Sequence, residues 1–463
     1  GPYPKGLMYY LTMMDSWLYD ETKPFIHIEA GDTFDELKKD ARNGYFEKLI
    51  KEYLLDNNHK SIISLVPEYG LEKEKEQKEA DKLAEYKSTL TNDELEELVK
   101  KTKELKEYQD TPSSQEELEK IPMLELSDIK REPAKDYNDV KSVDGIKIVH
   151  HNIFTNKIAY INLSFDTKCV PDELIPYMGL LGSTLSLMDT KNYTYPELTN
   201  EININCGGLA TGTALYSDKV DFSKNTIVYE VKSKALYEKV PFVLGMMEEI
   251  MYNTRFDDYK RLKEIIARIK SRLEASLMGQ GHSIAMLECC AQFSESAYYS
   301  DILRGYKYYE FIKKLDEEFE QNKTQIVDKL NKLVGYIFNK DNVIVSLTAD
   351  DEGYDCFAKA LSAKSCNIKD EHYNTAVRSF IPVNVKIGYT SASQVQYVAR
   401  CGNFVKDGYK YTGALKVLKV IFSYDYLWIN VRVKGGAYGC MSGSSRNGDF
   451  YMVSYRDPNL EKT

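Results

Sequence analysis

The residues with the clearest chemical potential are an arginine and a tyrosine on either side of a glycine pair. They lie in the run Val431-Arg-Val-Lys-Gly-Gly-Ala-Tyr-Gly439. A helix approaching from Tyr426 would end at Gly435, with Arg432 in its last turn, where a cation interacts favourably with the helix dipole. The two glycines allow a sharp turn into a strand headed by Tyr438. Both side chains would then project into one cleft.

The chemistry available to this pair is the recognition of a carbonyl. An arginine is permanently charged, and a tyrosine hydroxyl is a good neutral donor. Together they can bind a peptide carbonyl, or stabilise the oxyanion that develops when water attacks it. The same pattern also describes a helix C-cap followed by a packed ring, which is its commoner meaning. The residues by themselves leave both interpretations open.

A metal site is not indicated by the histidines. None stands in an H-E-x-x-H or H-x-x-E-H pattern, and no C-x-x-C pair occurs. His150 and His151 are adjacent on an expected strand, so they point to opposite faces and cannot grip one ion. We therefore expect ordinary surface or core histidines and no complete catalytic apparatus. The six are His27, His59, His150, His151, His282 and His372.

The elements that would position the arginine and tyrosine form a small α+β unit, residues 371–463. We expect a strand over 394–399 and a helix over 411–422 that continues, after a break, over 426–432. Strands over 437–443 and 449–455 follow, joined by the hairpin signal Asn447-Gly448. So few helices leave one face of this sheet bare, which predicts that the unit is truncated.

Three further segments precede it. Residues 136–370 alternate between strand and helix patterns, such as the alternating apolar residues of 158–165, and end on a strand around Val345; they are expected to form a complete α+β domain. Residues 71–135 are read as a helical hairpin linker, whose second helix starts at the capping box Thr91-Asn-Asp-Glu94. Residues 1–70, with helices and a strand over 61–66, resemble the tail of a preceding domain.

Composition narrows the partners. The net charge of −10 and pI near 5.4 argue against nucleic acid as a partner. No apolar run reaches the roughly 18 residues of a membrane span. The eight cysteines contain no C-x-x-C pair, which favours a reduced, cytoplasmic protein, bacterial rather than organellar. The adjacent Cys289 and Cys290 are expected to be buried helix residues.

Several short motifs, in the same order along the chain, resemble the presequence-protease and falcilysin-like branch of the inverted-zinc-motif (H-x-x-E-H) peptidases. The resemblance runs nearly end to end. Its most specific segments are Pro4-Lys-Gly-Leu7, Tyr53-Leu-Leu-Asp-Asn-Asn-His59, Ile121-Pro-Met-Leu-Glu-Leu-Ser-Asp128, Gln394-Val-Gln-Tyr-Val398, Tyr426-Leu-Trp428, Gly435-Gly-Ala-Tyr-Gly439 and Ser454-Tyr-Arg-Asp-Pro-Asn-Leu460.

The resemblance implies an architecture and an activity. Such enzymes have two clam-shell halves, each of two similar α+β domains, which enclose a chamber where unfolded peptides are cut. This chain would be the second half: a half-clam of two α+β domains, the second truncated, preceded by the hairpin linker. Zn²⁺, its ligands and the glutamate base would lie in the first half. The stretch Tyr177-Met-Gly-Leu-Leu-Gly182 stands where that motif would be and has lost its ligands.

The resemblance also assigns roles to the arginine and tyrosine. Tyr438 would donate to the scissile carbonyl or oxyanion, and Arg432 would hold a substrate carbonyl. The expected partners are unfolded peptides and the amino-terminal half of the same protein, with no nucleic acid and no membrane. The alternative is a non-catalytic, peptide-binding partner subunit of an active half. A purely structural helical scaffold is disfavoured by the Gly-Gly-Ala-Tyr-Gly match.

Overall fold

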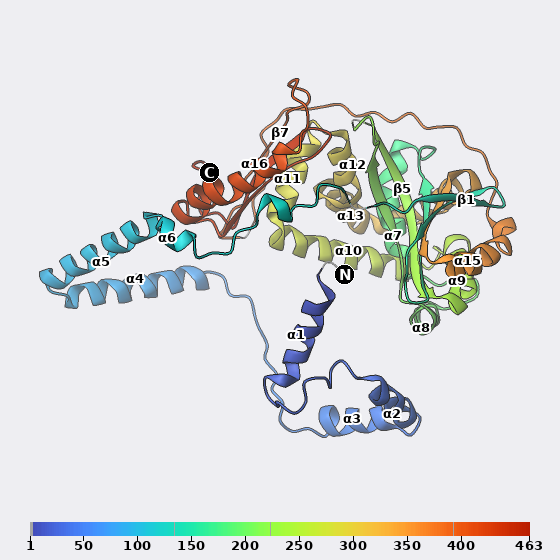
Figure 1. The fold of residues 1–463 in the computed structure, drawn as a ribbon, viewed down its shortest axis with the longest axis horizontal. Helices are drawn as coiled ribbons and strands as arrows, with labels where there is room; N and C mark the ends of the chain where they lie inside the picture. The colour runs from blue at the N-terminus through green and yellow to red at the C-terminus, as the bar shows by residue number, and fades with distance from the viewer. Residues whose placement is uncertain (1–2, 134, 223, 392) are drawn as a thin grey trace. The chain divides into compact units, whose positions relative to one another are not determined.

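The computed structural model describes residues 3–133, 135–222, 224–391 and 393–463. Internal contacts divide the chain into two compact units, Gly1–Ile129 and Lys130–Thr463 (Figure 1). Both β-sheets belong to the second unit, so the contacts place one division where the sequence suggested three. The boundaries at 70, 135 and 370 stay predictions.

The first unit is helical wherever it has regular structure. Its residues 61–66, expected to be a strand, form none, and Ile62 and Leu65 are 94% and 95% exposed. A strand needs a neighbour to satisfy its backbone groups, and none pairs with this segment among the described residues. The helical segments are α1 (Lys5–Trp17), α2 (Gly31–Ala41), α3 (Tyr45–Leu49), the π-helix η1 (Ile50–Leu55), α4 (Leu71–Thr89), α5 (Asn92–Asp110), α6 (Gln115–Leu118) and η2 (Leu126–Asp128).

The capping box of the linker is confirmed. The hydroxyl of Thr91 accepts from the N–H of Glu94 at 3.3 Å, and the carboxylate of Glu94 accepts from the N–H of Thr91 at 2.8 Å. These bonds satisfy two donors that a helix start leaves free. Two long charged helices, α4 and α5, thus follow each other with only Leu90 and Thr91 between them.

A six-stranded mixed sheet organises the second unit. Its order is β1-β2-β6-β3-β5-β4, and every pairing is antiparallel except that of β2 with β6. The strand expected to close the domain therefore lies inside the sheet, between two strands formed much earlier in the chain. The strands are β1 (Asp139–Val143), β2 (Ile146–Asn152), β3 (Ile158–Asp166), β4 (Leu209–Ser217), β5 (Asn225–Leu236) and β6 (Val343–Ala349).

One face of this sheet is buried and carries the core. The alternation expected in β3 is confirmed, since Ala159, Ile161, Leu163 and Phe165 are buried while their neighbours are more exposed. Helices from the long crossover between β3 and β6 contribute the matching apolar surface. They are α7 (Ile175–Thr184), α8 (Tyr195–Asn205), α9 (Val240–Tyr252), α10 (Tyr259–Gly279), α11 (Gly281–Ala291), α12 (Glu295–Arg304), α13 (Tyr306–Glu317) and α14 (Phe319–Ile337), followed after β6 by α15 (Asp351–Ser362).

Phe338 lies where these layers meet. Its ring is fully buried and packs edge-on against Phe165 at 5.1 Å, Tyr229 at 5.5 Å and Tyr252 at 6.1 Å, measured between ring centroids. Edge-to-face pairs of this kind add to the free energy gained by burying the rings. This cluster joins the end of α14 to the sheet, just before the chain enters β6.

The opposite face of the sheet is polar. There Glu230 accepts hydrogen bonds from Asn162 at 2.8 Å and Tyr216 at 2.9 Å and pairs with Lys232 at 2.5 Å. His150 and His151 show the same division: His150 is fully buried, whereas His151 is half-buried and bonds to the hydroxyl of Ser346 at 3.0 Å. The prediction that these two histidines point to opposite faces is confirmed.

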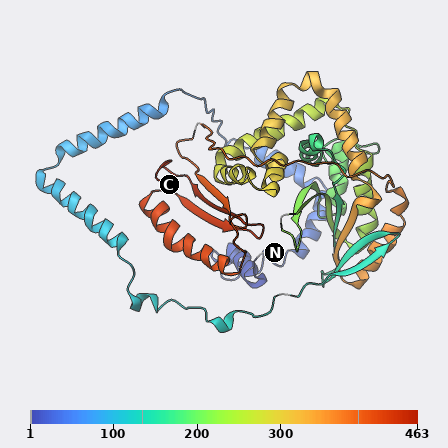
Figure 2. The same ribbon diagram turned by 90° about the horizontal axis from the view of Figure 1, so that it is seen from above.

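A separate three-stranded sheet, order β7-β9-β8, follows near the carboxyl end (Figure 2). It consists of β7 (Ala399–Asn403), β8 (Gly439–Ser444) and β9 (Asp449–Tyr455), with the helix α16 (Ala414–Ile421) between the first two. The strand expected over 394–399 was placed too early, because only Gln396 makes an isolated bridge there, to Asp457. The break expected after residue 422 is also wrong: α16 passes directly into the π-helix η7 (Phe422–Lys434).

This sheet rests on α11 through a small apolar cluster. Cys290, Ala291 and Ala297 are its buried members, and Cys401 of β7 and Tyr451 of β9 pack against them. Cys290 is thus a buried helix residue as expected, while Cys289 beside it is half-buried. None of the helices in the described ranges is long and apolar enough to cross a bilayer.

Two carboxylates are buried between α11 and α12. Asp301 is fully buried and Glu288 is 8% exposed. Lys307 reaches both, at 3.0 Å from Asp301 and 3.8 Å from Glu288. Burial, reinforced by a hydrogen bond with Asp301 and by its charge, raises the pKa of Glu288 from 4.5 to about 7. Glu288 therefore holds a proton in the folded protein at mildly acidic pH.

We predict that the free energy of unfolding falls as the pH rises from about 4.5 to 7. In that window the unfolded glutamate is ionised while the folded one is protonated, so rising pH favours unfolding. Glu288→Gln should weaken this pH dependence and raise the melting temperature at pH 8 by a few degrees relative to the wild type. The exposed Glu238→Gln serves as the control; identical pH profiles for Glu288→Gln and wild type would contradict the assignment.

Candidate carbonyl-binding site

The turn between η7 and β8 is built around its two glycines. The N–H of Gly436 donates to the carbonyl of Arg432 at 2.9 Å, and the N–H of Ala437 donates to the carbonyl of Val431 at 3.1 Å. Gly436 has a φ of 80°, in the left-handed region that closes many helices. A Cβ on Gly435 would lie 2.6 Å from the carbonyl oxygen of Val431. Glycine is therefore required at both positions, for different reasons.

The turn brings Arg432 and Tyr438 together. The guanidinium carbon of Arg432 lies 3.9 Å from the ring centroid of Trp428 and 5.6 Å from that of Tyr438. Stacking on an aromatic face orients a guanidinium without using its N–H donors. Arg432 lies in the last turn of η7, as expected, whereas β8 begins at Gly439, one residue after Tyr438. Tyr438 is 65% exposed, so the pair lies at the surface.

Tyr438 is supported from behind by a row of aromatic rings. Its ring packs edge-on against Tyr455 of β9 at 5.9 Å, and Tyr455 in turn lies 4.8 Å from His282 and 5.7 Å from Tyr397. Tyr397 donates its hydroxyl to the carbonyl of Met278 at 3.0 Å. The row thereby ties the site to the junction between α10 and α11.

His282 takes a supporting place in this row. Burial lowers the pKa of its imidazole, which favours the neutral ring. The sequence suggested neither this residue nor the supporting roles of Trp428 and Tyr455. The tripeptide Tyr426-Leu-Trp428 and the run that begins at Ser454 were available signals, since both belong to the resemblance, but they carry no information on mutual contact.

The arrangement offers two unengaged donors side by side. Among the residues that the structure describes, neither the hydroxyl of Tyr438 nor the guanidinium of Arg432 has a hydrogen-bond or ion-pair partner. The backbone around them is held firmly, by the N–H of Tyr438 to Arg456 at 3.2 Å and by Asn459 to the carbonyl of Gly435 at 2.6 Å. A fixed backbone with free donors can receive a carbonyl oxygen or an oxyanion.

The helix at the place of the zinc motif does not fit a zinc ion. Helix α7 contains no His, Cys, Asp or Glu, and zinc sites in proteins use those side chains. Met178, Leu180 and Leu181 are fully buried. A Cβ on Gly179 would come within 2.7 Å of the Tyr308 ring, so this helix is committed to packing.

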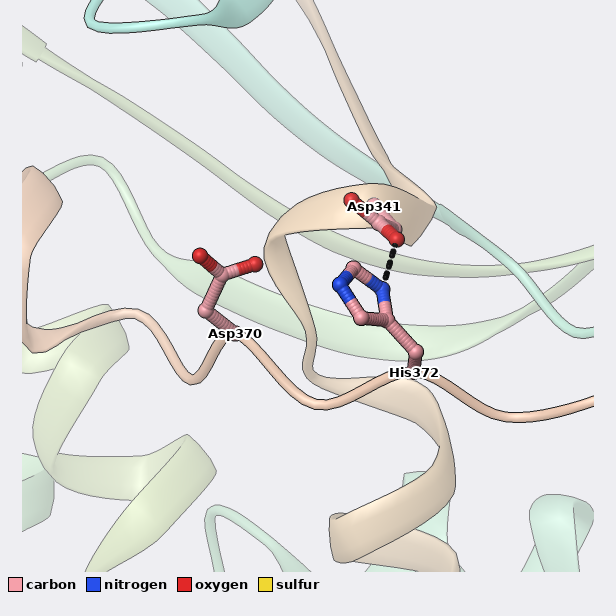
Figure 3. Close-up of side chains that lie close together, drawn as sticks. All are labelled: Asp341, Asp370 and His372. Carbon is pink, nitrogen blue, oxygen red and sulfur yellow. Dashed lines mark hydrogen bonds and ion pairs between the residues drawn. The ribbon is translucent and has the colours of Figure 1, made fainter.

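The structure brings together one group that the sequence left scattered: Asp341, Asp370 and His372. Each offers a ligand atom, and these atoms lie within 4.8 Å of one another. Figure 3 shows His372 bonded through Nδ1 to Asp341, with Asp370 beside them. All three are exposed, and the bond between the imidazole and Asp341 accounts for their approach. We assign this surface cluster no catalytic role.

The comparisons with known proteins identify the family. The family of sequences associated with the M16 peptidases of subfamily C matches residues 65–315, more than half of the chain, and the chain belongs to it. A second family description, "PreP C-terminal domain", matches residues 389–463, which include Arg432 and Tyr438. The resemblance to the presequence-protease branch is thereby confirmed.

Individual relatives agree with this assignment. "Protein HypA" of Clostridium perfringens is 40% identical over 100% of this chain and 47% of its own length. "Presequence protease 1, chloroplastic/mitochondrial" of Arabidopsis thaliana is 29% identical over 100% of this chain and 43% of its own length. The chain therefore spans about half the length of the curated relatives it matches.

A solved structure supports the fold. A conserved protein from Enterococcus faecalis V583 superimposes with a TM-score of 0.50 at 14% identity, covering 69% of this chain and 75% of the other. At that identity the likeness concerns the fold alone. It agrees with the expected mixed α+β class.

We predict that Gly436→Ala destabilises the protein by about 1–2 kcal/mol, because alanine is strained at positive φ. Gly413→Ala is the matched control: this glycine has a φ of −60° and open space around its Cβ position, so the change should be close to neutral. Chemical denaturation of both variants measures the difference. Equal midpoints would show that the left-handed turn is not under the constraint described.

Proposed function

We propose that this chain is the carboxy-terminal part of a zinc metalloendopeptidase that degrades short unfolded peptides in an enclosed chamber. Its own contribution is the pair Arg432 and Tyr438, which bind substrate and stabilise the transition state. The observation that carries the proposal is the contact between these two side chains, with their donors free, inside a segment that matches a presequence-protease domain.

In this proposal the two residues act on neighbouring carbonyl groups. The hydroxyl of Tyr438 donates to the scissile carbonyl oxygen, on which negative charge grows as water attacks. The guanidinium of Arg432, held against Trp428, donates to a second substrate carbonyl and aligns the peptide. Zinc and a general base would come from sequence outside these 463 residues, since α7 offers no ligand for a metal.

Two surfaces support a larger assembly around this chain. The polar face of the six-stranded sheet, around Glu230 and Lys232, suits the wall of a chamber that holds hydrated peptides. In the first unit, apolar side chains such as Tyr19 (88% exposed) and Ile62 (94% exposed) remain uncovered. Such extensive apolar exposure marks an interaction surface, and the amino-terminal half of the protein is the partner we propose for it.

The alternative, a non-catalytic peptide-binding subunit, shares the same site but not the same consequence of mutation. It requires Arg432 and Tyr438 to contribute to affinity without affecting turnover. The prediction of a cytoplasmic location rests on the cysteine usage and is part of the proposal. Peptide substrates, in place of nucleic acid or membranes, are likewise proposed.

The decisive variant is Tyr438→Phe in the full-length protein. Loss of one donor to an oxyanion is expected to lower kcat by about 10²–10³-fold, with KM and zinc content little changed. Cleavage of a quenched fluorescent peptide gives kcat and KM separately. Tyr424→Phe, which alters an exposed tyrosine of the same π-helix, is the control. A kcat for Tyr438→Phe equal to that of the control would remove Tyr438 from the mechanism and favour the partner-subunit alternative.

The 463-residue chain is expected to retain less than stoichiometric zinc after dialysis and to cut no peptide by itself. Elemental analysis measures the zinc, and the same fluorescent peptide tests cleavage. If zinc is retained, His372→Ala tells whether it is bound at the surface cluster of Asp341, Asp370 and His372. Stoichiometric zinc that survives this substitution would contradict the proposal that the ligands lie elsewhere.

A further inference from the structure

A second cluster of cationic side chains lies in an open cleft away from Tyr438. The cleft has a volume of about 430 Å³ and lies between the end of β4, helix α12 and the turn from β8 to β9. All of these elements belong to the second unit. The lining residues on which the argument depends are Phe222, Ser296, Arg304, Arg446, Asn447 and Asp449.

The two arginines of this cleft are available to a ligand. Arg304 and Arg446 are both exposed, and among the described residues neither forms an ion pair or a hydrogen bond. The guanidinium carbon of Arg446 lies 5.6 Å from the ring centroid of Phe222, which orients the group while leaving its N–H donors free. Two unpaired arginines in one cleft are notable in a chain with a net charge of −10.

The floor of the cleft is held by its own hydrogen bonds. Asn447 donates to Ser296 at 3.3 Å and to Asp449 at 2.7 Å. Asp449 also accepts from Ser294 at 2.5 Å and from Asn403 at 2.9 Å. These bonds tie the turn of the small sheet to the start of α12. Because they engage the polar groups of the floor, the guanidinium groups are the donors left for a ligand.

A helix-end role explains only one of the arginines. Arg304 lies in the last turn of α12, where a cation stabilises the helix dipole without any ligand. Arg446 lies in a turn between two strands and has no such explanation. Its placement beside Phe222 and across from Arg304 requires a different reason.

We propose that this cleft binds a carboxylate group of a peptide substrate. Guanidinium groups pair with carboxylates through two parallel hydrogen bonds. Asp449 in the floor reduces the charge of the lining to about +1, which suits a monoanionic carboxylate better than a dianionic phosphate. The assignment of a peptide rests on the proposed function. The carboxylate is that of the chain terminus or of an acidic side chain.

The cleft lies at the opposite end of β8 from Tyr438. Strand β8 (Gly439–Ser444) separates the two, and at about 3.3 Å per residue it spans about 20 Å. A peptide anchored by its carboxylate in the cleft would need about six extended residues to reach Tyr438. The cleft would thus act as a second anchor for substrates longer than the immediate reaction site requires.

Three labelled peptides test the proposal on the 463-residue chain by fluorescence anisotropy. The first has a free carboxyl end and no Asp or Glu; the second is the same peptide amidated; the third is amidated and carries one internal Glu. We expect the first or the third to bind about tenfold or more tightly than the second. Preference for the first identifies the terminal carboxylate, and preference for the third identifies a side chain.

Arg446→Gln and Arg304→Gln should each weaken the preferred peptide by about tenfold and remove the advantage over the amidated one. Arg400→Gln, at an exposed position of β7, removes the same charge from the same sheet and should have no effect. Circular dichroism verifies that each variant is folded. Equal binding of all three peptides, or no response to either arginine in folded variants, overturns the proposal. So does inorganic phosphate bound more tightly than any of the peptides.

The test is independent of the catalytic assignment. Tyr438→Phe should keep the same dependence of binding on the carboxylate, because the tyrosine does not line the cleft. Failure of Tyr438→Phe to alter turnover would therefore refute the proposed function while leaving the carboxylate site intact. Loss of the peptide preference with normal Tyr438 behaviour would refute only the cleft.

Discussion

Burial of one face of the six-stranded sheet is the constraint on which the second unit depends. The strand at its centre, β6, joins the sheet only after the chain has passed through the helices α7 to α14. Those helices supply the apolar surface that keeps the face dry, and Phe338 connects their last turn to Phe165 and Tyr229 of the strands. Because β6 pairs with both β2 and β3, it holds together two parts of the sheet that local pairing alone would leave separate.

The small sheet inherits its position from this core. It packs on α11 through the cluster of Cys290 and Ala291, and α11 follows directly from α10, whose Leu262 and Ile266 are buried in the main core. The aromatic row from Tyr438 through Tyr455 to His282 lies on the same junction. The proposed catalytic pair is thus anchored to a rigid part of the molecule, although both side chains are at the surface.

Within the site, backbone geometry and side-chain chemistry divide the task. Gly435 and Gly436 determine where the chain turns, because no side chain fits at the first and positive φ is required at the second. Trp428 then orients Arg432 by stacking, which leaves its donors free. The carboxylate cleft at the other end of β8 uses the same principle, with Phe222 in the place of Trp428. Aromatic support of an unpaired arginine is therefore common to both proposed contacts with substrate.

The sequence by itself determined the features that depend on local pattern: the α+β class, the alternation of β3, the capping box at Thr91, the hairpin at Asn447-Gly448 and the helix end at Arg432. Each of these follows from a few neighbouring residues. The family resemblance, carried by motifs spread along the chain, pointed to Arg432 and Tyr438. The strands expected over 61–66 and 394–399 failed because short apolar runs form strands only where a partner strand is present.

Only the tertiary structure decided how distant segments meet. It placed β6 inside the sheet, buried Glu288 against Asp301, set Tyr455 and His282 behind Tyr438, and brought Arg304 and Arg446 to one cleft. These contacts join residues from different helices and strands, and no periodicity or spacing encodes them. They follow from which apolar faces bury one another, a property of the whole folded chain.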